Sequence, residues 1–413
     1  MFKNALHQAI CKNLDKLEEW YDKKSKEVPF AITTSIDVRD AEFKISSVDA
    51  NIYPAGFNNI CEADRNSAPE IFQKFVNARY GNIKNILLLS EEHTNNPYYW
   101  ENVYAFSEII QNAGYEIRIS MPVENLQLSE MQTSGGKTLQ LTKTTKEGSK
   151  LVCEDGFEAD LVISNNDFSD PHQEWAQGLD LTMNPPRELG WYQRKKSTHF
   201  KHFQSLVNEF AATLDLDPWL LSCPTKSMMD FDTSSEQSKA KLAALVDEML
   251  AEIRSKYDEY NIAATPSVFI KNNAGTYGLA VTQVQSGDEV TAWNNKIRKK
   301  MKAAKGGGKV TEIILQEGIP SKVKSDGDTA EPVIYMFGSQ LIGGFFRTHS
   351  KKGESESLNS PGAVYRRLCM TDLRMEPDQH LEENVYGWLA RLSSLAVAYE
   401  AKEMGVKFKN YQL

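Results

Sequence analysis

Residues 267–281 read SVFIKNNAGTYGLAV, an apolar strand pattern that ends in a lysine and runs into a loop with two glycines. The pattern predicts a strand over 267–271, with Lys271 at its end, and a second strand after the loop. Gly275 and Gly278 have no Cβ, so the loop backbone can approach phosphate oxygens, and the lysine adds a positive charge. The same spacing occurs in plain surface hairpins, so a phosphate cradle and an ordinary turn both stay open at this point.

Two later segments favour the phosphate cradle. Residues 313–320 read IILQEGIP and predict a strand that runs into Gln316 and Glu317. Residues 331–347 read EPVIYMFGSQLIGGFFR and predict a hairpin that ends in Arg347. A lysine strand, a glycine loop, a second strand and an arginine hairpin therefore follow one another along the chain.

This order resembles the ATP-grasp superfamily, and within it the bacterial glutathione synthetase branch. The loop over residues 353–363, which contains Asn359, and the SDGD turn at 325–328 match later elements of that branch. The branch also has a phosphate-contacting lysine near the position of residues 194–196; of the three basic residues there we favour Lys196. The alternative for this segment is a helix N-terminus with a solvated basic face.

The first half of the chain predicts sheets of two kinds. Residues 31–38 and 43–52 are β-branched segments that predict a hairpin, after a helix over the first 26 residues. Buried strand patterns at 85–90, 115–121 and 160–164 alternate with helical patterns, which is typical of a parallel sheet. We expect an α/β, ATP-grasp-like fold with a parallel-sheet N-terminal region, a lid subdomain and a nucleotide-binding α+β domain. The expected division is an amino-acid substrate domain over 1–200, a helical segment and lid over 201–330, and the remainder of the ATP-grasp domain over 331–413.

Polar residues gather around the predicted hairpin in residues 35–60. Arginine and lysine suit a substrate carboxylate, and aspartate and asparagine suit an α-ammonium group. Residues 48–59, VDANIYPAGFNN, resemble the signature of a proteobacterial glutamate–cysteine ligase family, and this resemblance extends over essentially the whole chain. The candidate substrate-binding residues are Asp37, Arg39, Lys44, Asp49, Asn51, Asn58 and Asn59.

The resemblance implies an ATP-dependent ligase in which the γ-carboxylate of glutamate forms an acyl phosphate that the amine of cysteine then attacks. This is the first step of glutathione biosynthesis. Such chemistry needs charge neutralisation, positioning and exclusion of water more than a protein nucleophile. The implied cofactors are ATP and Mg²⁺.

The resemblance also implies roles for particular residues. Arg347 and Lys271 are the expected catalytic residues. The synthetase branch has a Glu-x-Asn metal pair after its final helix, and no such motif follows the last helix pattern here. The metal ligands must therefore come from elsewhere; Glu331, Glu354, Glu356 and Asn359 are candidates, of which we select Glu331 and Asn359. The expected ATP-binding residues are Lys196, Lys271, Gly275, Gly278, Gln316 and Glu317.

The composition of the chain disfavours several classes of protein. The net charge of −9 disfavours binding to nucleic acid, and no apolar run is long enough for a membrane span. The five cysteines are scattered without a CxxC pair, and the seven histidines show no zinc-binding spacing, so we expect a reduced, cytoplasmic enzyme with small-molecule partners. The sequence leaves open whether the protein forms a homo-oligomer.

Two other functions also fit the sequence. One is another ATP-grasp carboxylate–amine ligase, such as a glutathione synthetase, since the acceptor amine leaves no motif. The other is a non-catalytic protein that binds a nucleotide or an amino acid, which the missing Glu-x-Asn pair favours. Metal-dependent ATP turnover separates an enzyme from a binding protein.

Overall fold

The computed structural model describes residues 2–92, 95–275, 280–301, 310–376 and 382–413. Its largest sheet, the central sheet, is antiparallel with the strand order β18-β17-β16-β1-β2, and β15 pairs with β16. Its strands are β1 Thr33–Asp40, β2 Ile45–Asn51, β15 Lys324–Ser325, β16 Asp328–Phe337, β17 Gln340–His349 and β18 Val364–Leu368. The pairings of β1 with β2 and of β16 with β17 confirm both predicted hairpins. Because β1 also pairs with β16, this sheet joins the start of the chain to its last third.

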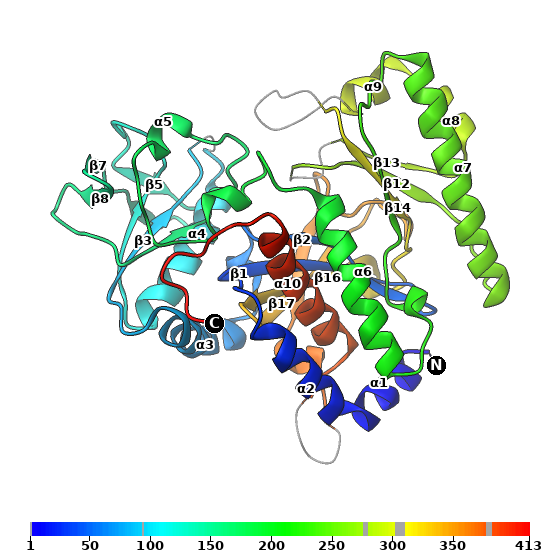
Figure 1. Ribbon diagram of the computed structural model, residues 1–413, viewed down its shortest axis with the longest axis horizontal. Helices are drawn as coiled ribbons and strands as arrows, with labels where there is room; N and C mark the ends of the chain where they lie inside the picture. Colours follow the sequence, from blue (N-terminus) through cyan, green and yellow to red (C-terminus); the bar gives the residue numbers. More distant parts are fainter. Residues whose placement is uncertain (1, 93–94, 276–279, 302–309, 377–381) are drawn as a thin grey trace.

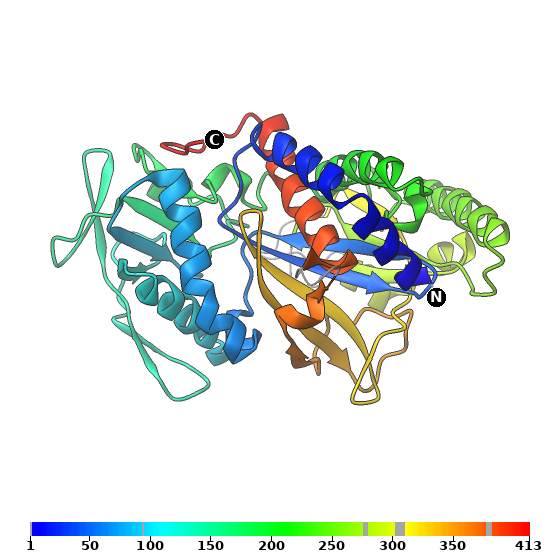
Figure 2. The same cartoon turned by 90° about the horizontal axis from the view of Figure 1, so that it is seen from below.

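A helical layer lies against one face of the central sheet (Figures 1 and 2). The helix α10 Val385–Glu403 is apolar over most of its surface, as expected for a helix surrounded by protein. Its Ser393 hydroxyl lies 3.1 Å from that of Ser47 on β2, and helix α6 Lys196–Thr213 packs alongside. The single helix predicted over the first 26 residues is wrong, because two helices, α1 Phe2–Lys12 and α2 Leu14–Ser25, occupy this stretch.

The second sheet, the parallel sheet, has the order β10-β9-β3-β4 and lies beside the central sheet (Figure 1). Its strands are β3 Asn85–Leu89, β4 Glu116–Ser120, β9 Leu161–Ser164 and β10 Met183–Asn184. Helix α3 Glu62–Tyr80 precedes β3, and helix α4 Pro97–Asn112 connects β3 to β4. All pairings are parallel, which confirms the prediction from alternating strand and helix patterns.

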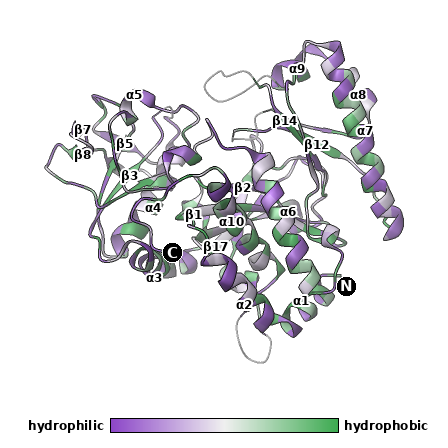
Figure 3. Ribbon diagram, viewed as in Figure 1, coloured by the Kyte–Doolittle hydropathy of each residue, from purple (hydrophilic) through white to green (hydrophobic). Residues whose placement is uncertain are grey.

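The third sheet, the lateral sheet, is antiparallel with the order β11-β14-β12-β13. Its strands are β11 Thr225–Met228, β12 Val268–Asn272, β13 Val281–Val284 and β14 Ile313–Glu317. Helices α7 Glu236–Glu259, α8 Gly287–Thr291 and α9 Asn295–Met301 lie with it on the far side of the molecule from the parallel sheet (Figure 1). This region has its own hydrophobic core, and α7 carries both hydrophobic and hydrophilic residues, as an amphipathic helix does (Figure 3).

The three sheets and their helices make a mixed α/β fold, as predicted. The division of the chain at residues 200 and 330 stays a prediction. Within the described parts of the chain, none of the helices has the length and apolar character needed to cross a bilayer.

Candidate active site

Charged side chains share the face of the central sheet opposite α10. On β1, Asp37 and Arg39 are two residues apart and therefore point to the same face. The register places Val333 of β16 opposite Asp37, so Glu331, two residues earlier, lies on that face as well. Arg347 of β17 is the direct cross-strand partner of Glu331. Strand alternation and register thus bring two carboxylates and two guanidinium groups together.

These four groups form a buried ion-pair network. The Nη1 atom of Arg347 donates to Asp37 and to Glu331, at 2.7 Å each, and the Nε atom of Arg39 lies 2.5 Å from the second oxygen of Glu331. Burial alone would raise the pKa of Glu331, but Arg39 and Arg347 together hold it below its ordinary value. Burial raises the pKa of Asp37, which Arg347 only partly offsets. The network therefore holds two neighbouring carboxylates with different proton affinities.

Arg39 also fixes a loop. Its Nη1 and Nη2 atoms donate to the backbone carbonyls of Glu354 and Glu356, at 3.1 and 2.9 Å. This loop connects β17 to β18 and carries Ser357 and Asn359. The arginine on the sheet therefore positions the segment that faces it.

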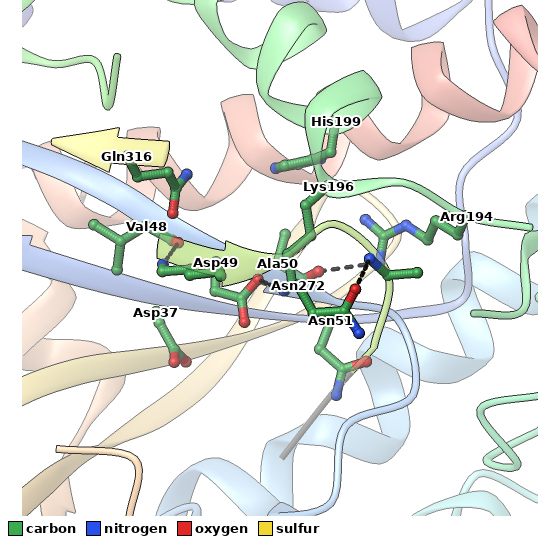
Figure 4. A network of polar contacts seen from close by, with 12 residues as sticks. Asp37, Val48, Asp49, Ala50, Asn51, Arg194, Lys196, His199, Asn272 and Gln316 are labelled. Atoms are coloured by element: carbon green, nitrogen blue, oxygen red, sulfur yellow. Dashed lines mark hydrogen bonds and ion pairs between the residues drawn. The ribbon is translucent and has the colours of Figure 1, made fainter. Parts of the chain in front are cut away.

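The lateral sheet and α6 contribute two lysines that face β2. Lys271 lies on β12, and its Nζ donates to the carbonyl oxygen of Val48 at 3.2 Å. Lys196 is the first residue of α6, and its Nζ pairs with Asp49 (Figure 4). Burial would raise the pKa of Asp49, but the two lysines lower it to about 2. Burial lowers the pKa of Lys271.

Two further contacts hold α6 and its lysine in place. The backbone N–H of Lys196 donates to the carbonyl of Asn273 at 2.8 Å, which ties the helix to the end of β12. Arg194 donates to the carbonyl of Ala50 at 3.0 Å (Figure 4). It also forms a buried ion pair with Glu400 of α10. The start of α6 is thus bound to both sheets.

A cavity lies between the central and lateral sheets, where these charged groups meet. It has a volume of about 90 Å³ and is partly open to solvent. Its lining residues are Asp37, Arg39, Val48, Asp49, Lys196, Phe269, Lys271, Asn272, Gly275, Val281, Gln316, Glu317, Ile319, Glu331, Ser357 and Asn359. Within the described part of the chain, the Oε1 atoms of Gln316 and Glu317 are buried without a hydrogen-bond partner. A buried acceptor left unpaired is costly, so a donor from a ligand would satisfy it.

Comparison with known proteins gives the family of this chain. A family model for glutamate-cysteine ligase matches residues 7–401. The chain belongs to the glutamate–cysteine ligase family. The resemblance noted in residues 48–59 is thereby confirmed, and so is the expectation of a ligase that joins glutamate to cysteine, the first step of glutathione biosynthesis.

A crystal structure of a protein from Methylobacillus flagellatus KT, provisionally assigned as a gamma-glutamylcysteine synthetase, has the same fold. Its sequence is 33% identical to that of this glutamate–cysteine ligase family member. The superposition covers 96% of each chain, with a TM-score of 0.86. Far weaker similarity is found to a glutathione synthetase-like effector from Globodera pallida, at 12% identity, 88% and 83% coverage and a TM-score of 0.40. D-alanyl-alanine synthetase A from Vibrio cholerae gives 13% identity, 78% and 81% coverage and a TM-score of 0.33. A search of curated protein sequences finds no match.

The structure brings together most of the residues that sequence reasoning selected. Ten of them line the cavity: Asp37, Arg39, Asp49, Lys196, Lys271, Gly275, Gln316, Glu317, Glu331 and Asn359. Of the three basic residues at 194–196, only Lys196 reaches the cavity, because Arg194 pairs with Glu400 and Lys195 with Glu312. Gly278 lies outside the described residues.

Five selected residues lie elsewhere. Lys44 is fully buried, and its Nζ lies 2.5 Å from Glu317 Oε2. The Asn51 side chain bonds the backbone of Tyr53. Asn58 and Asn59 line a separate depression beside Cys61, and Arg347 lies behind Asp37 and Glu331 rather than on the cavity wall.

Some lining residues were missed by sequence reasoning. Phe269 and Val281 supply apolar walls, and their strand patterns gave no sign that one side faces a ligand. Ser357 stands two residues before Asn359 in the same loop, so the selection of Asn359 could have been extended to it. Asn273, which ties the loop after β12 to α6, could be recognised only after the two segments were placed together.

Proposed function

We propose that the cavity between the central and lateral sheets is the site where this ligase activates glutamate with ATP through an acyl phosphate. The observation that carries the proposal is the convergence of Lys196, Lys271 and Arg39 on one cavity that also exposes the carboxylates of Asp37 and Glu331. Transfer of a phosphoryl group between two anions needs such cations to reduce repulsion, and a partly enclosed cavity limits hydrolysis of the acyl phosphate by water. The proposed architecture is ATP-grasp-like, with the lateral sheet acting as the lid.

The nucleotide would lie along the lateral sheet. The amide oxygen of Gln316 is a buried acceptor without a partner among the described residues, and its Nε2 atom donates to Thr225 at 3.1 Å, which fixes the acceptor's direction. An exocyclic amino group, as in adenine, supplies the missing donor. Lys271 and Lys196 then lie in position for phosphate oxygens, next to the Gly275 backbone.

The residues around Asp37 fit a magnesium ion. Asp37, Glu331 and Asn359 offer only oxygen ligands on one cavity wall, which is the donor set that Mg²⁺ prefers. Arg347 bonds both carboxylates and keeps them side by side, and is therefore a positioning residue in this proposal. When bound, the ion would neutralise charge on the phosphates.

Glutamate would lie with its γ-carboxylate toward the lysines, on the side of β1 and β2. Arg39 already contacts Glu331 and two backbone carbonyls, so it holds the loop that carries Asn359 in addition to facing the substrate. Asp49, whose pKa is lowered to about 2, stays ionised, and its ion pair with Lys196 orients that side chain. The amine of cysteine then attacks the acyl phosphate from the open side of the cavity.

Product formation tests this proposal. Purified protein with ATP and Mg²⁺ receives glutamate, cysteine, or both, and phosphate and γ-glutamylcysteine are measured together. We expect phosphate release that requires both amino acids, with dipeptide in equal amount. Dipeptide formation by a Lys271→Met variant at the rate of an exposed-site control, Lys84→Met, would show that the reaction takes place elsewhere in the protein.

A further inference from the structure

Two cysteines from opposite ends of the chain meet at one point. Cys61 immediately precedes α3, and Cys369 immediately follows β18, 308 residues later in the sequence. Their Sγ atoms are 2.9 Å apart, and both thiols are free. A disulfide bond of about 2.05 Å therefore needs the two sulfur atoms to approach only slightly.

Neighbouring residues hold the two cysteine-bearing segments next to each other. Asp64, in the first turn of α3, accepts a hydrogen bond from the backbone N–H of Met370 at 2.8 Å, so each cysteine's own segment is bound to the other's. The Nε atom of Arg367 donates to the Cys369 sulfur at 2.7 Å. This contact fixes the position of the Cys369 sulfur beside that of Cys61. Burial and the contact with Cys369 raise the pKa of the Cys61 thiol to about 11, so the thiolate that attacks a disulfide forms more readily at alkaline pH.

These sulfurs together with Asp64 could also suggest a metal site, because their ligand atoms lie within 4.8 Å of one another. Two sulfurs on one tetrahedral zinc ion, each about 2.3 Å from it, are about 3.7 Å apart, which is wider than the separation here. The Arg367 cation would also face the metal ion. The geometry therefore favours a bond between the sulfurs over a shared metal.

The two thiols differ in access. Cys61 is partly exposed and lines an open depression with Asn58, Asn59 and Arg366, whereas Cys369 is 3% exposed. A small molecule that enters the depression reaches Cys61 first. Cys369 lies directly behind it.

We propose that Cys61 and Cys369 are a redox modification site that reacts with low-molecular-weight disulfides. Cys61 loses its proton and attacks one sulfur of R–S–S–R, which forms a mixed disulfide and releases R–S⁻. Cys369 then attacks the Cys61 sulfur, forms the intramolecular bond and releases the second R–S⁻. Two electrons pass from the protein thiols to the small disulfide, and the two thiol protons are taken up by the two released thiolates.

Thiol counting and peptide mapping of the full-length protein test this proposal. The reduced protein is incubated with 2-hydroxyethyl disulfide, and free thiols are then counted in denaturant. We expect the number of free thiols per chain to fall from five to three. Peptide mapping should give one cross-linked peptide pair, which contains Cys61 and Cys369. A stable mixed disulfide with no second thiol lost, or a cross-link that involves another cysteine, would overturn the proposal.

Variants assign the order of the two steps. Cys369→Ser should accumulate a mixed disulfide at Cys61, while the matched control Cys11→Ser should lose two of its four thiols through the same cross-link. If Cys369→Ser fails to fold, the wild-type peptide map still decides the outcome. If added zinc binds to the protein at one ion per chain and prevents the loss of the two thiols, the cysteines form a metal site and the proposal is refuted. None of these readouts depends on ligase activity, so failure here is distinct from failure of the proposed function.

Discussion

Replacement of Arg347 by methionine should cost far more stability than loss of a surface arginine. The substitution removes two contacts of 2.7 Å and leaves the Asp37 and Glu331 carboxylates buried side by side. Glu331 keeps Arg39, but among the described residues Arg347 is the one ion-pair partner of Asp37. Removal of one member of a buried ion pair costs about 3–5 kcal/mol of unfolding free energy, so we expect a loss in that range near pH 8.

The loss of unfolding free energy caused by Arg347→Met should depend on pH through Asp37. The pKa of Asp37 is already raised by burial, and without Arg347 it should rise further. A carboxyl group with a raised pKa in the folded state binds its proton more tightly there than in the unfolded chain, so its presence favours folding at low pH and opposes it as pH rises. The loss caused by Arg347→Met should therefore shrink from about pH 8 to about pH 5.

Urea unfolding of matched variants checks the reasoning. Arg366→Met, on β18, removes partly exposed ion pairs with Asp326 and Asp328 and should cost no more than about 1 kcal/mol. The double variant Asp37→Asn/Arg347→Met should recover part of the stability, since it no longer buries an unpaired charge. Equal losses for Arg347→Met and Arg366→Met, or a loss independent of pH, would refute the account of this network.

Three further predictions concern the cavity and its supports. Lys271→Met should lower kcat/KM for ATP about 13- to 160-fold, from about 1.5–3 kcal/mol for a hydrogen bond to a charged group, with Lys84→Met as the unaffected control in the same steady-state assay. Gln316→Leu should raise the KM for ATP about 2- to 12-fold with little change in the KM for glutamate, because it removes a neutral acceptor; an equal change in both constants would count against its position beside the base. Lys44→Met should destabilise the protein by about 3–5 kcal/mol, since it leaves the buried Glu317 carboxylate without its ammonium partner and with the Trp219 indole N–H as its remaining donor among the described residues. The loss should grow with pH because burial raises the pKa of Glu317, and urea unfolding at several pH values measures it.

Local pattern predicted local structure. The strands around Lys271, the hairpin that ends near Arg347 and the alternating strands at 85–164 all have neighbours close in sequence, and their periodicity identifies them. The pairing of β1 with β16 joins residues about 300 positions apart, and no local period encodes it. The sequence therefore indicated the units but not the sheet that places them around one cavity.

The candidate site residues show the same difference between what local sequence predicts and what depends on the fold. Lys271 and Glu317 stand at strand ends that face the cavity, and the residue types and positions pointed to them. Lys44 was selected because charged residues are dense near the first hairpin, but density does not say whether a side chain faces the cavity or a buried partner. The contact between Cys61 and Cys369 depends on the fold, and their positions 308 residues apart in the sequence give no sign of it.

Transfer of isotope tests the central claim most directly. Glutamate labelled with ¹⁸O in its γ-carboxylate is supplied with cysteine, ATP and Mg²⁺, and the phosphate produced is examined by mass spectrometry. If the cavity activates glutamate as an acyl phosphate, each phosphate carries one labelled oxygen, and its rate of formation falls in Lys271→Met but not in Lys84→Met. Phosphate without label, formed together with dipeptide, would contradict the account.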